Sequence, residues 1–240
     1  MNKTINKDIF GKALIDYQSG NFTENITTYS SVSGKDIMEL SWLFRTFHEM
    51  PLIEQTALKL CKGYVLDIGC GAGGHSLYLQ AKHLKTKAID ISDGAIETCN
   101  KRGVNNASVQ NFWEIQNEKF DTILALMNGT GLCGKLENLE NFLNHLKSLL
   151  NKNGQILIDS SDIIYMFQDD FGDLELPNEA NYYGEVQFEF KYKNLFSKKF
   201  DWLFLDFNKL NFYANNVGLQ CELIKAGYHY DYLAKLTLIK

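Results

Sequence analysis

The sequence predicts an α/β protein built on a doubly wound, mostly parallel sheet of seven strands. Between residues 60 and 160, short apolar runs alternate with segments whose apolar residues recur at helical spacing. This alternation is typical of parallel sheets with helices on both faces. The last two apolar runs, residues 221–225 and 233–239, are joined by a connection too short for a crossover helix. We therefore expect an antiparallel strand at the C-terminal end of the sheet.

The composition indicates one globular domain and argues against several classes of partner. The chain has 240 residues, of which 45% are hydrophobic and 22% charged, which allows one large core. It has no apolar run of membrane-spanning length and no signal-like N-terminus, so a cytoplasmic protein without membrane contact is expected. The net charge of −5, without a basic cluster, argues against nucleic-acid binding. The five scattered cysteines favour free thiols and predict no metal site.

Residues 1–60 are predicted to form a helical N-terminal cap. A break is expected near residues 30–35, and a second helical part over residues 37–50. Apolar residues recur at helical spacing in the first part, at Phe10, Leu14 and Tyr17.

Residues 61–160 are predicted to form the cofactor-binding core. The clearest helix covers residues 136–150, where leucines and one phenylalanine follow a three-four spacing. The fourth strand is almost wholly apolar, as a strand covered on both faces requires. The five strands of this region are expected at residues 65–68, 86–91, 107–110, 120–127 and 155–159.

Residues 161–205 interrupt the alternation and are predicted to form a β-rich insertion that caps the substrate. Apolar side chains at 186, 188, 190 and 192 alternate with polar ones, which is typical of a half-exposed antiparallel strand. Residues 200–205 are expected to pair with it. Residues 206–240 are then expected to form a helix and the terminal antiparallel strand pair.

The most informative segment is YVLDIGCGAGGHSLYL, residues 64–79. A strand followed by a glycine turn and a helix N-terminus lets the backbone approach a nucleotide-like ligand. The glycines fit both G-x-G-x-x-G, typical of dinucleotide sites, and D-x-G-x-G-x-G. Asp67 lies two residues before the first glycine, where it would repel a pyrophosphate and attract the cationic S-adenosylmethionine. Asp67 therefore favours S-adenosylmethionine as the ligand.

The series VLDIGCGAG, AIDIS, FDTILAL and NGQILIDSS resembles the class I S-adenosylmethionine-dependent methyltransferases over roughly residues 60–160. The resemblance implies that the backbone of residues 69–73 passes under the methionine part of the cofactor. It also implies that Asp67 orients the ammonium group, directly or through water. Asp90 would accept hydrogen bonds from both ribose hydroxyls, and Ile91 would lie against the adenine.

The sequence departs from this family after the third strand, where an acid usually meets the adenine amino group. Here the strand runs into Gln110, Asn111, Phe112 and Trp113. Asn111 would accept that hydrogen bond through its amide oxygen, and Phe112 would supply a backbone contact. The residues predicted to bind the cofactor are Asp67, Gly69, Cys70, Gly71, Gly73, Asp90, Ile91, Asn111, Phe112 and Met127.

The acceptor is expected to be a small molecule, bound by a monomer or a homodimer. Methyl transfer from a sulfonium is an in-line displacement with a neutral leaving group, so positioning and exclusion of water supply much of the catalysis. No residue is identifiable as a catalytic base, and an oxygen, nitrogen or carbon acceptor stays open. Two alternatives also stay open, an NAD(P)-dependent oxidoreductase and a non-catalytic module that binds S-adenosylmethionine. The predicted substrate residues are Tyr17, Tyr29, Arg45, Asn128 and Tyr165.

Overall fold

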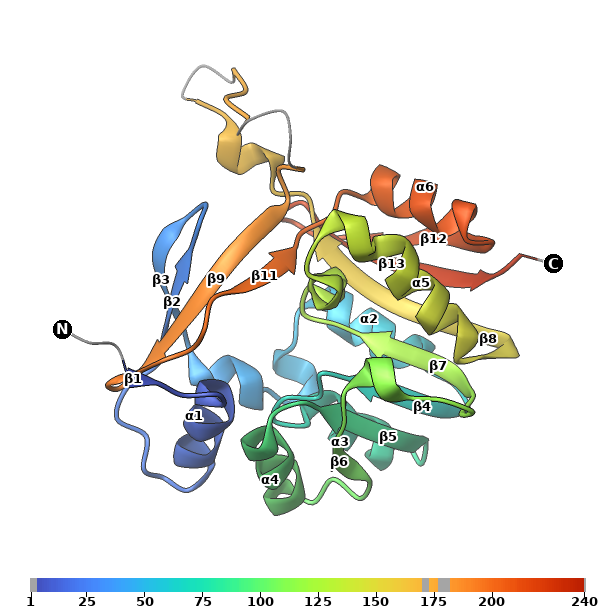
Figure 1. Cartoon of the computed structure of the whole chain (residues 1–240). Helices are drawn as coiled ribbons and strands as arrows, with labels where there is room; N and C mark the ends of the chain where they lie inside the picture. Colours follow the sequence, from blue (N-terminus) through green and yellow to red (C-terminus); the bar gives the residue numbers. More distant parts are fainter. Residues whose placement is uncertain (1–3, 170–172, 177–181, 240) are drawn as a thin grey trace.

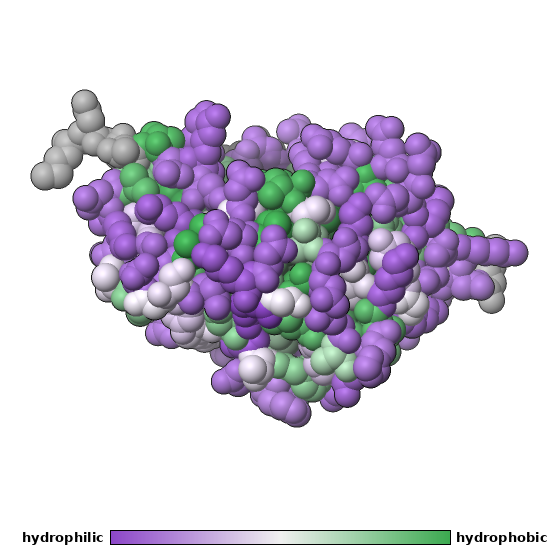
Figure 2. Space-filling model, turned by 90° about the horizontal axis from the view of Figure 1, so that it is seen from below, coloured by the Kyte–Doolittle hydropathy of each residue, from purple (hydrophilic) through white to green (hydrophobic). Residues whose placement is uncertain are grey.

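The computed structural model describes residues 4–169, 173–176 and 182–239. These residues build two sheets, a larger one covered by helices and a smaller one at its side (Figure 1). No helix within the described ranges is long and apolar enough to cross a bilayer. Seen from below, the surface is mostly hydrophilic, with hydrophobic residues gathered near its middle (Figure 2).

The larger sheet has seven strands in the order β12-β13-β8-β7-β4-β5-β6. Six of them run in the same direction, and only β13, between β8 and β12, is antiparallel to its neighbours. This confirms the predicted doubly wound sheet with an antiparallel C-terminal strand. The strands are β4 (Tyr64–Ile68), β5 (Lys85–Asp90), β6 (Ala107–Val109), β7 (Phe120–Ala125), β8 (Leu150–Ser161), β12 (Leu219–Ala226) and β13 (Asp231–Leu238).

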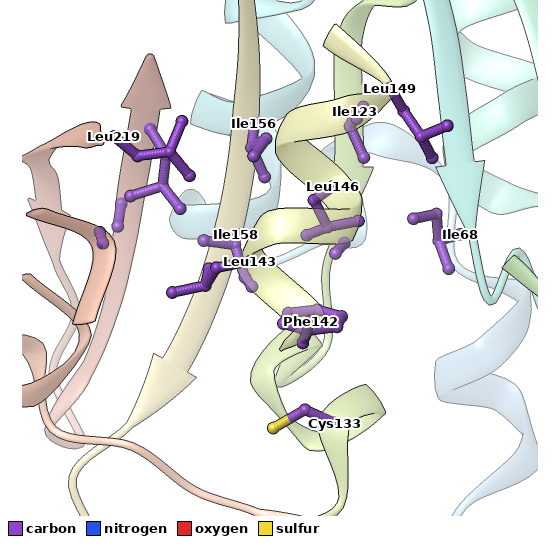
Figure 3. Close-up of a cluster of buried hydrophobic side chains, with 14 of the residues drawn as sticks. Ile68, Ile123, Cys133, Phe142, Leu143, Leu146, Leu149, Ile156, Ile158 and Leu219 are labelled. Atoms are coloured by element: carbon purple, nitrogen blue, oxygen red, sulfur yellow. The ribbon is translucent and has the colours of Figure 1, made fainter. Parts of the chain in front are cut away.

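Helices cover both faces of this sheet, because its central strands are buried on both sides. On one face, α5 (Leu139–Ser148) and α6 (Phe207–Asn216) pack with Ile123, Ile156 and Ile158 in one core (Figure 3). The neighbouring residues Leu124 and Leu157 point to the opposite face. There they pack with α2 (Leu52–Leu60) and α3 (Gly74–Ala81), while α4 (Asp93–Arg102) covers the β5 end.

The smaller sheet joins the N-terminal segment to the insertion. It has the order β1-β10-β9-β2-β3, and β11 also pairs with β9, on the side away from β2. Its strands β1, β2 and β3 precede the core in the chain, and β9, β10 and β11 follow β8 (Figure 1). They are β1 (Thr4–Ile5), β2 (Ile26–Ser30), β3 (Gly34–Met38), β9 (Glu185–Tyr192), β10 (Leu195–Phe196) and β11 (Phe200–Leu203). The predicted β-rich insertion is confirmed.

The N-terminal cap is helical only in part. Helices form at α1 (Ile9–Gln18) and α2, but the helix expected over residues 37–50 is wrong. That stretch ends strand β3 and continues as two 3-10 turns, η1 (Leu40–Phe44) and η2 (Phe47–Glu49). The β2–β3 hairpin is stabilised by pairing with β9, which lies far away in the sequence. The spacing of apolar residues within one segment does not reveal a strand partner that is distant in the sequence.

Candidate cofactor and acceptor site

A cavity of about 1070 Å³ lies between the two sheets, at the carboxyl ends of β4, β5 and β7. The glycine loop lines one side of it, and aromatic side chains from β9 and β11 line the other. Pockets for one small ligand usually measure about 300–1000 Å³. The cavity therefore has room for a cofactor and a second small molecule together.

The glycine loop leaves β4 in a conformation that suits glycine. Gly69, Gly71 and Gly73 have φ angles of 71°, 53° and 79°, which side chains disfavour. The N–H groups of Gly69 and Cys70 donate to the carbonyl of Ile89, at 2.9 and 3.0 Å. Gly69, Cys70 and Gly71 line the cavity, whereas Gly73 caps α3 outside the lining. A Cβ at Gly69 would meet nothing within 4 Å, so its backbone is open to a ligand.

Asp90 lies at the end of β5 and connects the glycine loop to α4. One carboxylate oxygen accepts from the Gly71 N–H and the other from the Ser92 N–H, both at 3.0 Å. Burial raises the pKa of Asp90 above its ordinary value. Beside it Ile91 is 75% exposed and lines the cavity, as an apolar surface for a flat ligand would. Both predicted residues are therefore at the cavity.

Asp67 lies beneath the glycine loop and does not line the cavity. Its carboxylate accepts from the Ser76 hydroxyl at 2.6 Å, and burial raises its pKa. That it orients an ammonium group, directly or through water, stays a prediction.

The segment after β6 supplies the other end of the cavity. Asn111 and Phe112 line it as expected, together with Trp113, which the sequence interpretation did not include. The Asn111 amide oxygen already accepts from the Trp113 N–H at 3.1 Å and caps η3 (Phe112–Glu114). The turn-forming role of Asn111 is thus present in the structure, and its adenine contact stays a prediction.

A buried ionic triad adjoins the glycine loop. Glu54 on α2 accepts from Arg45 at 2.8 Å with one oxygen and from His75 at 2.9 Å with the other. The three side chains are 7%, 13% and 12% exposed and all line the cavity. The Nε–H of Arg45 is buried without a partner among the described residues. Glu54 and His75 were missed as site residues, because only the fold brings them together.

The pH dependence of stability should report on this triad. Burial alone lowers the pKa of His75, but the Glu54 hydrogen bond and the carboxylates of Asp67, Glu54 and Asp159 outweigh it, so the pKa lies above 6.5. Protonated His75 then stabilises the fold below its unfolded pKa, and this stabilisation is lost as the pH rises through the folded pKa. We expect the melting temperature to fall as the pH rises above about 6.5, the ordinary pKa of histidine, and to fall less in His75→Gln. Parallel curves for the two proteins would contradict this assignment.

Aromatic rings form a continuous wall opposite the glycine loop. Because side chains alternate along a strand, Phe188 and Phe190 of β9 share one face, with Phe200 and Trp202 of β11 beside them. The rings of Phe190 and Phe200 lie 5.0 Å apart. We call Phe188, Phe190, Phe200, Trp202 and Phe204 the aromatic wall, and all five line the cavity.

The structure brings two of the five predicted substrate residues, Arg45 and Asn128, into this cavity. Tyr17 instead packs on Phe44, at 4.5 Å between ring centroids. Tyr29 directly follows Thr28, which lines the cavity from the same strand. Because side chains alternate along a strand, Tyr29 lies on the other face of the sheet. Tyr165 stacks on Tyr230 at 5.0 Å and lines a separate cavity of about 390 Å³.

Comparison with known proteins identifies the family. Residues 43–207 match the family described as a methyltransferase domain. A solved structure of a SAM-dependent methyltransferase from Bacteroides fragilis, in complex with S-adenosyl-L-homocysteine, is 40% identical. The match covers 100% of both chains with a TM-score of 0.91. The chain belongs to the class I S-adenosylmethionine-dependent methyltransferases.

This methyltransferase shares its fold with more distant enzymes. The CcbJ methyltransferase from Streptomyces caelestis is 12% identical, with a TM-score of 0.62 over 80% of this chain and 91% of the other. CalS10, an amino pentose methyltransferase from Micromonospora echinaspora, is 13% identical, with a TM-score of 0.57 over 81% and 92%. Curated protein sequences contain no significant match. The family membership confirms S-adenosylmethionine as the cofactor and disfavours the nicotinamide alternative.

Proposed function

We propose that this methyltransferase acts on a small organic molecule that lies against the aromatic wall. The observation that carries the proposal is the shared cavity of about 1070 Å³, with the glycine loop on one side and the wall on the other. A cavity lined by rings suits a largely apolar acceptor. The N-terminal segment 1–60 and the insertion 161–205 then act as one cap, because their strands form one sheet.

For the cofactor we propose a path along the glycine loop. The methionine part lies over residues 69–71, near Met127, and the ribose hydroxyls donate to Asp90. The adenine lies between Ile91 and the segment 111–113. The Nε–H of Arg45, which has no partner within the described part of the chain, is suited to the methionine carboxylate, because a guanidinium pairs well with carboxylates. Arg45, predicted from the sequence to contact the acceptor, would then contact the cofactor instead.

Bound S-adenosylmethionine supplies an activated methyl group, and the protein supplies geometry. The glycine loop and Asp90 hold one reactant, while the aromatic wall orients the other and excludes water. Placing two reactants within one cavity removes much of the entropic cost of their meeting. We further propose a cytoplasmic monomer or homodimer. The net charge of −5 supports the absence of a nucleic-acid partner.

Calorimetry tests the cofactor assignment. Wild-type protein is expected to bind S-adenosylhomocysteine and not NADH. Asp90→Ala should weaken that binding by roughly 10- to 100-fold, because a hydrogen bond to a charged group contributes about 1.5–3 kcal/mol. Unchanged affinity in Asp90→Ala would refute the assignment of Asp90.

Methyl transfer tests the acceptor class. Labelled S-adenosylmethionine is supplied with either the low-molecular-mass fraction or the macromolecular fraction of a cell extract. Label should appear in the first fraction. Transfer only to the second fraction would point to a protein or nucleic-acid acceptor and overturn the proposal.

A further inference from the structure

The turn after β7 has a backbone that two ordinary residues seldom adopt. Met127 and Asn128 have φ angles of 66° and 63° in succession, and neither is glycine. Left-handed backbone of this kind costs of order 1–3 kcal/mol per residue and persists only where its surroundings impose it. Both residues line the cavity, between the glycine loop and the aromatic wall.

Two consecutive residues of β8 impose this conformation from opposite faces of the sheet. The Ser160 hydroxyl donates to the Asn128 side chain at 2.8 Å, and that side chain donates to the Leu203 carbonyl at 3.1 Å. Asp159 acts on the backbone itself. Its two carboxylate oxygens accept from the N–H groups of Met127, at 3.2 Å, and Gly129, at 3.0 Å.

The carboxylate of Asp159 therefore spans Asn128 and holds the N–H groups on both sides of it. A carboxylate accepting from backbone N–H groups makes the stronger, charge-assisted kind of hydrogen bond. Asp159 faces the side of the sheet that carries Glu54 on α2 and His75 on α3, and both groups influence it. Burial raises the pKa of Asp159 to about 6. The charged form of Asp159 therefore does not stabilise the folded state.

We propose that Asp159 is a positioning residue for methyl transfer, which holds the turn of residues 127–129 in the shape that the cofactor and acceptor require. The inference rests on the proposed function, because it assumes that the turn lies beside the transferred methyl group. Asp159 contacts neither reactant in this arrangement and acts through the turn.

The test compares two carboxylates on neighbouring strands, Asp159 near the C-terminal end of β8 and Asp121 near the start of β7. Asp121, at the start of β7, also accepts two hydrogen bonds, from the Tyr64 N–H and the Asn151 side chain, both at 2.8 Å. These bonds lower the pKa of Asp121, so its charge supports the fold at neutral pH. Asp121→Asn is therefore the matched control for Asp159→Asn. Calorimetry with S-adenosylhomocysteine and thermal unfolding are measured for both variants.

Asp159→Asn should weaken S-adenosylhomocysteine binding by about tenfold, with a melting temperature equal to or above that of the wild type. Asp121→Asn should bind as the wild type does and melt roughly 2–4 °C lower. Wild-type affinity in Asp159→Asn, or equal losses of affinity in both variants, would overturn the proposal. If the wild-type protein failed to bind S-adenosylhomocysteine, the proposed function would fail instead.

A measurement on the wild-type protein keeps the proposal testable if Asp159→Asn does not fold. The backbone amide resonances of Met127 and Gly129 are followed by NMR as the pH is lowered. They should shift with a midpoint near pH 6, the pKa of Asp159, and the Tyr64 amide should not. Amides of Met127 and Gly129 that stay constant through this range would show that Asp159 does not hold the turn.

Discussion

Glu54→Ala is expected to destabilise the folded protein by about 3–5 kcal/mol, the usual cost of removing one partner from a buried ion pair. Glu54 is buried on α2 and bonds both Arg45 and His75. Without it, two cationic groups remain in a site that is nearly closed to solvent. Arg45 also loses the partner that orients its guanidinium toward the cavity. S-adenosylhomocysteine affinity should therefore fall together with stability.

Denaturant unfolding of wild type and variant measures this loss. Glu97→Ala is the matched control, because Glu97 forms an exposed ion pair with Lys101 one helical turn away, and such pairs contribute only about 0.3–0.5 kcal/mol. A loss below about 1 kcal/mol in Glu54→Ala would mean that the triad is not a stabilising unit.

The second large effect is expected at the crossing of α1 and α4. A Cβ added at Gly94 would lie 2.5–2.6 Å from backbone atoms of Gly11, so α1 must move away. Asp8, just before α1, accepts from the Ser92 hydroxyl at 2.7 Å and the Gly94 N–H at 2.9 Å, next to Asp90. Gly94→Ala should cost about 1–3 kcal/mol of stability. It should also weaken cofactor binding, because α1 lies beside the cofactor cavity.

Gly94→Ala is decisive because the two possible outcomes change the free energy of unfolding in opposite directions. In a helix without the crossing, glycine to alanine stabilises by up to about 1 kcal/mol. A stabilised variant with wild-type S-adenosylhomocysteine affinity would therefore show that α1 does not pack on α4 as described. Thermal unfolding and calorimetry on the same preparation give both values.

The core of the fold and one side of the cavity could be predicted from the sequence, because their signals are local. Apolar runs predict strands, and three glycines with positive φ follow the first of them. Asp90 ends its strand, and the helix cap Ser92 follows two residues later. Each of these features depends on neighbours within a few residues, so the strand–loop–helix order was recognisable before its packing was known.

The acceptor side could not be predicted in the same way. Tyr29 and Phe190 are both aromatic and both lie on strands of the smaller sheet, yet only Phe190 lines the cavity. The register between β2 and β9 decides which face each ring occupies, and a shift of one residue would exchange the faces. That register joins segments at opposite ends of the chain.

By itself, the sequence determined a parallel α/β sheet and indicated S-adenosylmethionine as its ligand, because a glycine turn and the acids beside it are features of neighbouring residues. The tertiary structure alone decided which side chains from distant segments line the cavity and support its turns. Arg45, Glu54 and His75 meet only when α2 and α3 pack side by side, and Asp159 reaches the turn of residues 127–129 only because β7 and β8 are neighbours. Such contacts depend on how distant segments pack, which local spacing does not encode.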